Sequence, residues 1–194
     1  FNFIESSPSA DGLPLKILNY KWMKLQTLFL FAFVLIILSS CSQKKYDKTR
    51  NITVAFYNVE NLFDLEDEPG KNDEEFTPGN NKKWTAKRYQ TKIDTLARVL
   101  SSINKNELPE LIGLCEVENK KVVEDLVNSK HLKEGNYKVV HYESPDFRGI
   151  DCALVYRPDE FKVIKSSPIK VNSKGKPNYT TRDILYVKGK TINS

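Results

Sequence analysis

The sequence lacks a clustered run of basic residues, a long apolar run and a rich set of cysteines. Its net charge of +5, or +4 from Cys41 onward, is mild, so it permits a polyanionic substrate but does not indicate a dedicated nucleic-acid groove. The uncharged apolar run at 28–38 is too short to cross a bilayer comfortably, because a spanning helix needs roughly 20 apolar residues. Cys115 and Cys152 lie in apolar segments; we favour buried thiols there, and a disulfide between them is the alternative.

The apolar run belongs to a segment with the layout of a secretory signal. Lys24 supplies a positive start, the run follows, and the sequence LSSC ends at Cys41. These four residues resemble the lipobox of bacterial lipoproteins, in which cleavage precedes a cysteine that is then lipidated. The resemblance implies an exported protein that a lipid on Cys41 anchors to a membrane of the cell envelope. An uncleaved signal anchor is the alternative interpretation.

These features divide the chain into four parts. Residues 1–22 precede the only methionine and form no periodic element, so we interpret them as an upstream or non-native segment. We expect a lipoprotein signal peptide at 23–40, a basic tether at 41–50, and a folded domain at 51–194. This last part is long enough to bury a core.

The domain alternates strands and helices before it continues with strands only. Apolar residues at helical spacing predict a helix over 85–104, with Trp84 at its entrance, and a second over 118–132. We expect Glu118 to be the first-turn acid of that second helix. The predicted strands are 52–59, 111–117, 137–142, 150–156, 161–165 and 184–187. This order indicates the α+β class, with a mostly antiparallel sheet system and helices on its outer faces.

Two of these strands end in carboxylates and amides. FYNVENLF at 56–63 and LIGLCEVEN at 111–119 each place acidic and amide side chains at the mouth of an apolar strand. A hard cation such as Mg²⁺ prefers oxygen ligands of this kind and keeps several waters for its substrate. Asn58 and Glu60 could instead cap a turn, whereas Glu116 at a buried strand end is harder to explain as structure.

Four motifs in order resemble the endonuclease/exonuclease/phosphatase superfamily. They are residues 57–61 (YNVEN), 113–118 (GLCEVE), 148–156 (RGIDCALVY) and 181–185 (TRDIL). The helix between the first two, with Lys83-Trp84-Thr85 and Arg88-Tyr89, is similar to an exported Bacteroidetes-type branch. The resemblance implies a four-layer α/β/β/α sandwich of two mostly antiparallel sheets, of which this chain would be the N-terminal half.

The resemblance also implies metal-dependent hydrolysis of a phosphoester by water. Glu116 would bind Mg²⁺ or Mn²⁺, Asn58 would orient a water or a phosphate oxygen, and Glu60 would support the metal. Arg148 and Arg182 would neutralise substrate phosphate, as planar bidentate donors do well. A pairing of Arg148 with Asp151 is the structural alternative.

Three functions stay open. The first is an exported, lipid-anchored nuclease; the second is a phosphoesterase that acts on lipid head groups or sugar phosphates; the third is a surface lipoprotein that keeps the fold without catalysis. Nothing predicts a protein partner. The family also needs later histidine and aspartate residues, which His131 and His141 do not match in position. We therefore expect this chain alone to hydrolyse no phosphodiester, and to aggregate because a sheet without its partner exposes apolar surface.

Overall fold

The computed structural model describes residues 51–105, 107–172, 175 and 180–192. The expectations for residues 1–50, which include the signal peptide, the lipidation of Cys41 and the tether, lie outside the described residues. Among those that are described, no helix combines the length and the apolar character needed to span a membrane.

Four strands form the larger sheet in the spatial order β1-β2-β4-β3. They are β1 (Val54–Leu62), β2 (Leu111–Val117), β3 (Lys138–His141) and β4 (Asp151–Tyr156). A helical crossover joins β1 to β2 and makes them parallel, whereas β4 pairs antiparallel with both β2 and β3. The strand predicted at 111–117 is confirmed at both ends, and the other three differ from prediction by up to three residues at an end.

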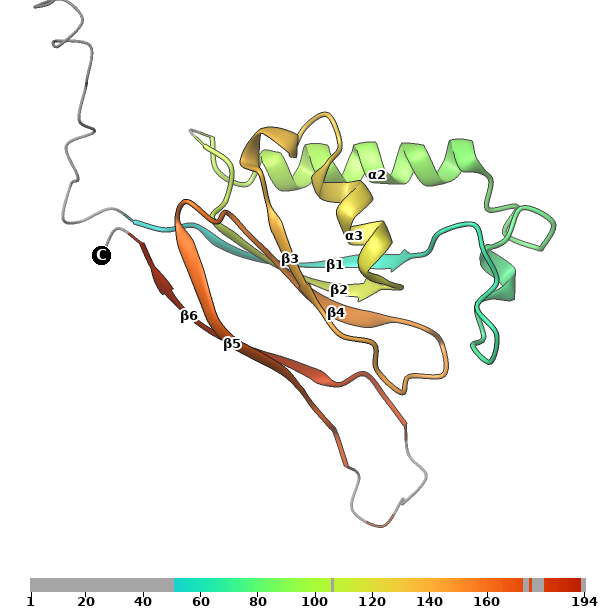
Figure 1. The fold of residues 1–194 in the computed structure, drawn as a ribbon. Helices are drawn as coiled ribbons and strands as arrows, with labels where there is room; N and C mark the ends of the chain where they lie inside the picture. The colour runs from blue at the N-terminus through green and yellow to red at the C-terminus, as the bar shows by residue number, and fades with distance from the viewer. Residues whose placement is uncertain (1–50, 106, 173–174, 176–179, 193–194) are drawn as a thin grey trace, which may run out of the picture. The chain divides into compact units, whose positions relative to one another are not determined.

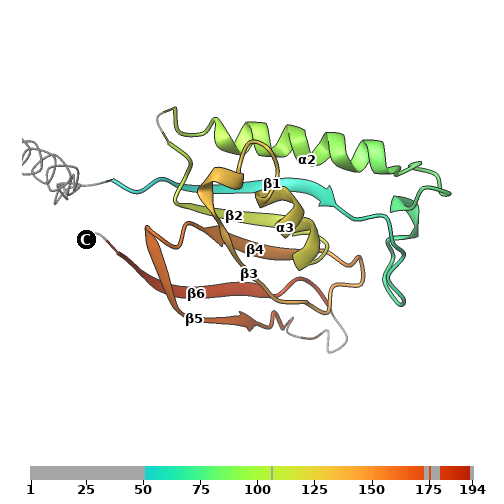
Figure 2. The same cartoon turned by 45° about the horizontal axis from the view of Figure 1, so that its top comes forward.

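A two-stranded antiparallel sheet covers one face of the larger sheet. It consists of β5 (Phe161–Ile169) and β6 (Ile184–Thr191), both four residues longer than predicted at their carboxyl ends. Figures 1 and 2 show the helices on one face of the larger sheet and the β5–β6 pair on the other. The expected α+β class is therefore confirmed, in the form of a partial sandwich with a helical layer and two sheets.

The longer helix, α2 (Ala86–Ser101), connects β1 to β2. It begins where the Thr85 side chain accepts a hydrogen bond from the Arg88 amide, which satisfies one of the free N–H groups at a helix start. The prediction placed its end at 104, but it ends at Ser101 and leaves Ile103 beyond it, 43% exposed. Ile103 fits the helical period yet contributes nothing to the core, so the spacing alone overestimated the helix.

The second helix is α3 (Lys120–Val127), with Asn119 as its N-cap. The prediction of Glu118 as its first-turn acid is wrong, because Glu118 precedes the cap and is 2% exposed. Short 3₁₀ turns also occur at η1 (Glu74–Phe76) and η2 (Lys133–Gly135). The helix is shorter than the predicted 118–132, since the chain from Asn128 onward turns toward β3.

The core lies between the helices and the larger sheet. Side chains from one stripe of each helix pack against alternate residues of the strands, as a half-buried sheet face requires. Fully buried members include Leu100, Leu126, Ile112, Leu114 and Val117. This packing fixes the ends of β1 and β2, where the predicted site residues lie.

The opposite face of the larger sheet encloses a cavity of about 770 Å³ with the β5–β6 pair. Its lining is mainly apolar, and Phe56 on the edge strand β1 remains 74% exposed. Cys115 and Cys152 are direct cross-strand partners, and both are free thiols of intermediate exposure. The expectation of thiols rather than a disulfide is confirmed, but the expected burial is not complete, because both cysteines are of intermediate exposure. Their partial burial raises the pKa of each thiol.

Candidate functional site

The pairing between the ends of β1 and β2 is interrupted by a bulge. Asn58 pairs with Cys115 and Leu62 with Val117, so residues 59–61 of β1 face only Glu116 of β2. Glu116 is also an extra residue relative to β4. Bulges of this kind redirect side chains and are frequent beside active sites. The predicted residues Asn58, Glu60 and Glu116 therefore meet at one irregular point of the sheet.

The backbone at this point is strained in both strands. Glu60, Asn61 and Glu116 have φ values of 54°, 63° and 66°, in the left-handed region that residues with a Cβ rarely occupy. The Asn58 side-chain oxygen accepts a hydrogen bond from the Glu60 amide at 2.7 Å, which stabilises the turn out of the regular strand. The turn-capping alternative for Asn58 is thus realised, and its NH₂ group is not used by that bond.

Glu116 lies next to the predicted phosphate ligand Arg182. Arg182 Nη1 is 3.7 Å from Glu116 Oε1, and the two side chains are 28% and 19% exposed. Arg182 lies two residues before β6, so the smaller sheet carries this cation to the end of the larger one. The structure therefore brings together two residues that are 66 positions apart in the sequence and that were assigned to metal and phosphate.

Arg148 belongs to a neighbouring ion pair. Its guanidinium binds both carboxylate oxygens of Asp146, with Nε–Oδ1 and Nη2–Oδ2 distances of 3.0 and 2.7 Å. The alternative pairing with Asp151 is therefore wrong. Burial would raise the pKa of Asp146, but its bonds to Arg148 and the positive charges of Arg148 and Arg182 hold it below the usual range. Arg148 and Arg182 thus act on one carboxylate, which places them in the same electrostatic environment.

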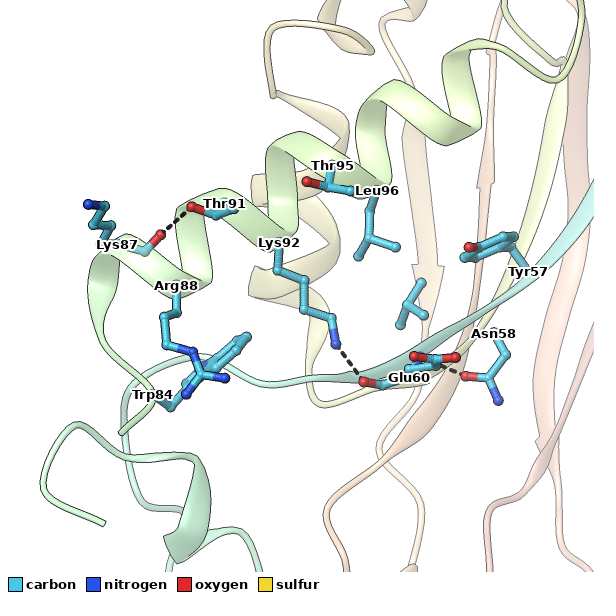
Figure 3. A pocket seen from close by; sticks show the side chains of 11 residues that line it. Tyr57, Asn58, Glu60, Trp84, Lys87, Arg88, Thr91, Lys92, Thr95 and Leu96 are labelled. Atoms are coloured by element: carbon cyan, nitrogen blue, oxygen red, sulfur yellow. Dashed lines mark hydrogen bonds between the residues drawn. The ribbon is translucent and has the colours of Figure 1, made fainter. Parts of the chain in front are cut away.

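Lys92 of α2 anchors the bulge from the helical side. Its Nζ donates to the carbonyl oxygens of Glu60 at 2.5 Å and Asn61 at 3.2 Å, the two residues in left-handed conformation on β1. Figure 3 shows Lys92 extending from α2 toward Glu60 within a cleft of about 490 Å³. Burial lowers the pKa of Lys92, although the charges of Glu60 and Glu116 oppose that effect.

Sequence reasoning did not identify Lys92 or Asp146. Lys92 precedes Ile93 of the buried helical stripe, so its position on α2 was predictable. Its partners were not, because they are backbone carbonyls whose orientation depends on the bulge. Asp146 offered only its spacing of two residues from Arg148 as a signal.

Glu118 supports the site from inside the domain. Its Oε2 accepts a hydrogen bond from the Asp64 amide at 2.6 Å, and its own amide donates to the Leu62 carbonyl. Burial above all, together with the charges of Asp64, Asp73 and Glu68, raises the pKa of Glu118 to about 8. A largely buried carboxyl thus links the end of β1 to the start of α3.

The two histidines of the chain lie apart from this cluster. His131 Nε2 is 3.5 Å from Asp94 on α2, and His141 Nε2 is 3.4 Å from Asp151 on β4. Neither contributes to the pairs that Glu116 and Arg182 form.

A family model described as the endonuclease/exonuclease/phosphatase family matches residues 53–194. The chain belongs to this family. The match covers all four sequence motifs and every strand and helix described above. A search of curated proteins finds no match. Members of the endonuclease/exonuclease/phosphatase family generally hydrolyse phosphoester bonds and typically depend on a divalent metal. Membership therefore supports a hydrolase of the general phosphodiesterase, nuclease or phosphatase type.

Proposed function

We propose that the bulge at the ends of β1 and β2 is the metal- and phosphate-binding part of a phosphodiester hydrolase whose substrate is nucleic acid. The observation that carries the proposal is the position of Glu116, a carboxylate in left-handed conformation at a double register shift, 3.7 Å from Arg182. Backbone strain persists only where the surrounding structure enforces it, and it gathers at functional sites.

The residues present fit a hard divalent cation. Glu116 and Glu60 offer carboxylate oxygens and Asn58 offers an amide, which are donors that Mg²⁺ and Mn²⁺ accept. Glu116 is only partly exposed, and its ion-pair partner Arg182 lies at a distance longer than a direct hydrogen bond. Mg²⁺ or Mn²⁺ supplies charge neutralisation and polarisation of a phosphoryl oxygen.

The other residues of the site bind and orient. Arg182 supplies a planar donor for a phosphate oxygen beside Glu116, and Arg148 adds positive charge to the same region. Lys92 holds the bulge in place through two carbonyls, so it positions Glu60 without contacting the substrate. Glu60, Glu116, Arg148 and Arg182 each lie in one of the four sequence motifs, and Lys92 lies outside them.

The mild positive charge of the chain permits nucleic acid as the substrate, and Arg182 and Arg148 offer positive charge to its phosphates. We further propose export and lipid anchoring at Cys41, which the LSSC sequence supports. Hydrolysis assays on DNA, RNA and phospholipid vesicles with the full gene product distinguish a nuclease from a phosphoesterase that acts on lipid head groups. Degradation of phospholipid alone would contradict the choice of substrate.

Metal binding is the direct test with the 194-residue chain. Mn²⁺ titration followed by electron paramagnetic resonance should show a site that Glu116→Gln weakens at least about tenfold, since one carboxylate ligand and its charge are lost. Glu134→Gln, which alters an exposed carboxylate on η2, should leave the titration unchanged. Equal Mn²⁺ binding in the wild type and Glu116→Gln would refute the assignment of Glu116.

We expect this chain to bind metal without turnover, because neither histidine lies at the site to accept a proton from water. The assay is release of acid-soluble nucleotides from DNA and RNA in Mg²⁺. Turnover that disappears in Glu116→Ala would show that the groups described here are sufficient for catalysis.

A further inference from the structure

A second cluster of metal-binding side chains lies at the ends of β3 and β4. His141, Glu143 and Asp151 each offer one donor atom, and these three atoms lie within 4.8 Å of one another. The shortest distance is 3.4 Å, from His141 Nε2 to Asp151 Oδ2. Glu143 Oε1 lies 3.7 Å from the other ring nitrogen, Nδ1, which an ion bound at Nε2 does not use. Two ligands of a tetrahedral Zn²⁺ at about 2.0–2.1 Å from the ion are separated by roughly 3.3 Å, so the first of these pairs already has the required spacing.

Two buried polar atoms of the cluster lack a hydrogen-bond partner in the described part of the chain. The His141 and Asp151 side chains are each 3% exposed. His141 Nε2 and Asp151 Oδ1 have no hydrogen-bond partner among the described residues. Leaving such atoms unpaired costs about 1–3 kcal/mol each, and more for a charged group. His141 Nε2 is 3.4 Å from Asp151 Oδ2, so this unsatisfied nitrogen faces into the cluster.

The charges of the cluster are also unbalanced. In the described part of the chain, neither Glu143 nor Asp151 has a lysine or arginine within ion-pair distance. The nearby Lys71 instead donates to the carbonyls of Ser144 and Asp146. The site therefore favours an added positive charge.

The cluster and the proposed phosphoesterase site consist of different side chains. The ion pairs of the cluster run from His141 to Glu143 and Asp151, whereas Glu116 pairs with Arg182. Asp151 also lines a small pocket together with Asp183, the residue after Arg182. The two sites are therefore neighbours that share no ligand.

We propose that His141, Glu143 and Asp151 form a second metal site that binds Zn²⁺ or a similar transition-metal ion. An imidazole nitrogen selects such ions over Mg²⁺, which prefers oxygen ligands only. Glu143 is 58% exposed, so its carboxylate moves into place with little resistance and leaves a fourth position for water. The ion would link β3 to β4 and give the buried polar atoms of His141 and Asp151 a bonding partner.

The presence of only two histidines makes nuclear magnetic resonance the sharpest test. Zn²⁺ added to the EDTA-treated 194-residue chain should shift the ring signals of His141 and saturate at one equivalent, while His131 is unaffected. His131→Gln assigns the two sets of signals and serves as a control. Excess Mg²⁺ should leave His141 unchanged.

Variants separate the cluster from the other site. Glu143→Gln, at an exposed side chain, should weaken Zn²⁺ binding at least about tenfold, whereas Glu134→Gln should not. Glu116→Gln should leave the His141 response intact. If it removes the response, the zinc belongs to the phosphoesterase site and the proposal fails, whatever the outcome of the Mn²⁺ titration.

Zinc K-edge X-ray absorption provides a measurement that self-association of the chain does not prevent. The spectrum should show scattering from one imidazole nitrogen bound to the zinc ion. This contribution should disappear in His141→Gln. A zinc shell of oxygens only, or His141 signals that do not respond to Zn²⁺ in a folded chain, would show that His141 and Asp151 form an ion pair and nothing more.

Discussion

The buried carboxyl of Glu118 makes the stability of the domain depend on pH in an unusual direction. The folded state holds the Glu118 proton up to a pKa of about 8, whereas the unfolded chain releases it near the ordinary value of 4.5. Between these values the folded state binds more protons than the unfolded state, so the free energy of unfolding falls as pH rises. A tenfold difference in proton affinity corresponds to about 1.4 kcal/mol, so the full interval amounts to roughly 5 kcal/mol as an upper limit.

Glu118→Gln removes this titration and keeps the contact. The amide oxygen can accept the same bond from the Asp64 amide, while the side chain stays neutral at every pH. Near pH 4.5 the variant and the wild type should differ by a small constant. Between pH 4.5 and pH 8.5, the difference in the free energy of unfolding should change in favour of the variant by about 2 kcal/mol or more. The upper limit of this change is roughly 5 kcal/mol.

Urea unfolding at a series of pH values, with EDTA present to remove metal ions, measures this difference. The pH dependence contributed by Asp73, whose pKa burial also raises, is common to both proteins and cancels in the comparison. Glu124→Gln alters an exposed helical carboxylate paired with Lys120 and should follow the wild type. A stability difference between Glu118→Gln and wild type that stays constant from pH 4.5 to 8.5 would refute the reasoning.

Other predictions concern the bulge, the exposed sheet face and the core. Lys92→Met removes the bonds to both bulge carbonyls and should weaken Mn²⁺ binding several-fold in the resonance titration, whereas the exposed Lys87→Met should not. Phe56→Ser should reduce self-association in sedimentation velocity with little change in stability, since this ring is 74% exposed; an unchanged size distribution would count against the apolar face as the cause. Tyr137→Phe leaves the Pro109 carbonyl without its buried donor and should lower urea stability by about 1–3 kcal/mol, and a loss below about 0.5 kcal/mol would contradict that role.

The elements of the fold were predictable because local patterns decide them. β2 is a continuous apolar run with a proline before it, and the prediction matched it residue by residue. The helix ends were less predictable, because periodicity continues past the point where packing stops: Ile103 continues the α2 period in solvent. Glu118 was misjudged for a related reason, since an acid before a helix is ordinarily exposed and here the end of β1 covers it.

The sequence predicted several residues of the candidate site, but not the backbone geometry that positions them. The motifs identified Asn58, Glu116 and Arg182, and the structure places Glu116 beside Arg182. The bulge that aims Glu116 is invisible in the sequence, because glycine, the usual sign of left-handed backbone, is absent from it. The alternative pairing of Arg148 with Asp151 does not occur, because Arg148 binds Asp146 and β4 buries Asp151 against His141.

The pair of Glu116 with Arg182 connects metal and phosphate binding in one physical picture. At 3.7 Å, each residue partly neutralises the other. A cation that binds Glu116 takes over that neutralisation and leaves the Arg182 guanidinium to a second anion, and a substrate phosphate is the anion that both charges attract. The ion pair therefore holds two ligand groups in position, on separate sheets, and each ligand lowers the cost of binding the other. Under the proposed function, this coupling would require the β5–β6 pair, which brings Arg182 to the larger sheet, as well as the bulge, which aims Glu116 toward it.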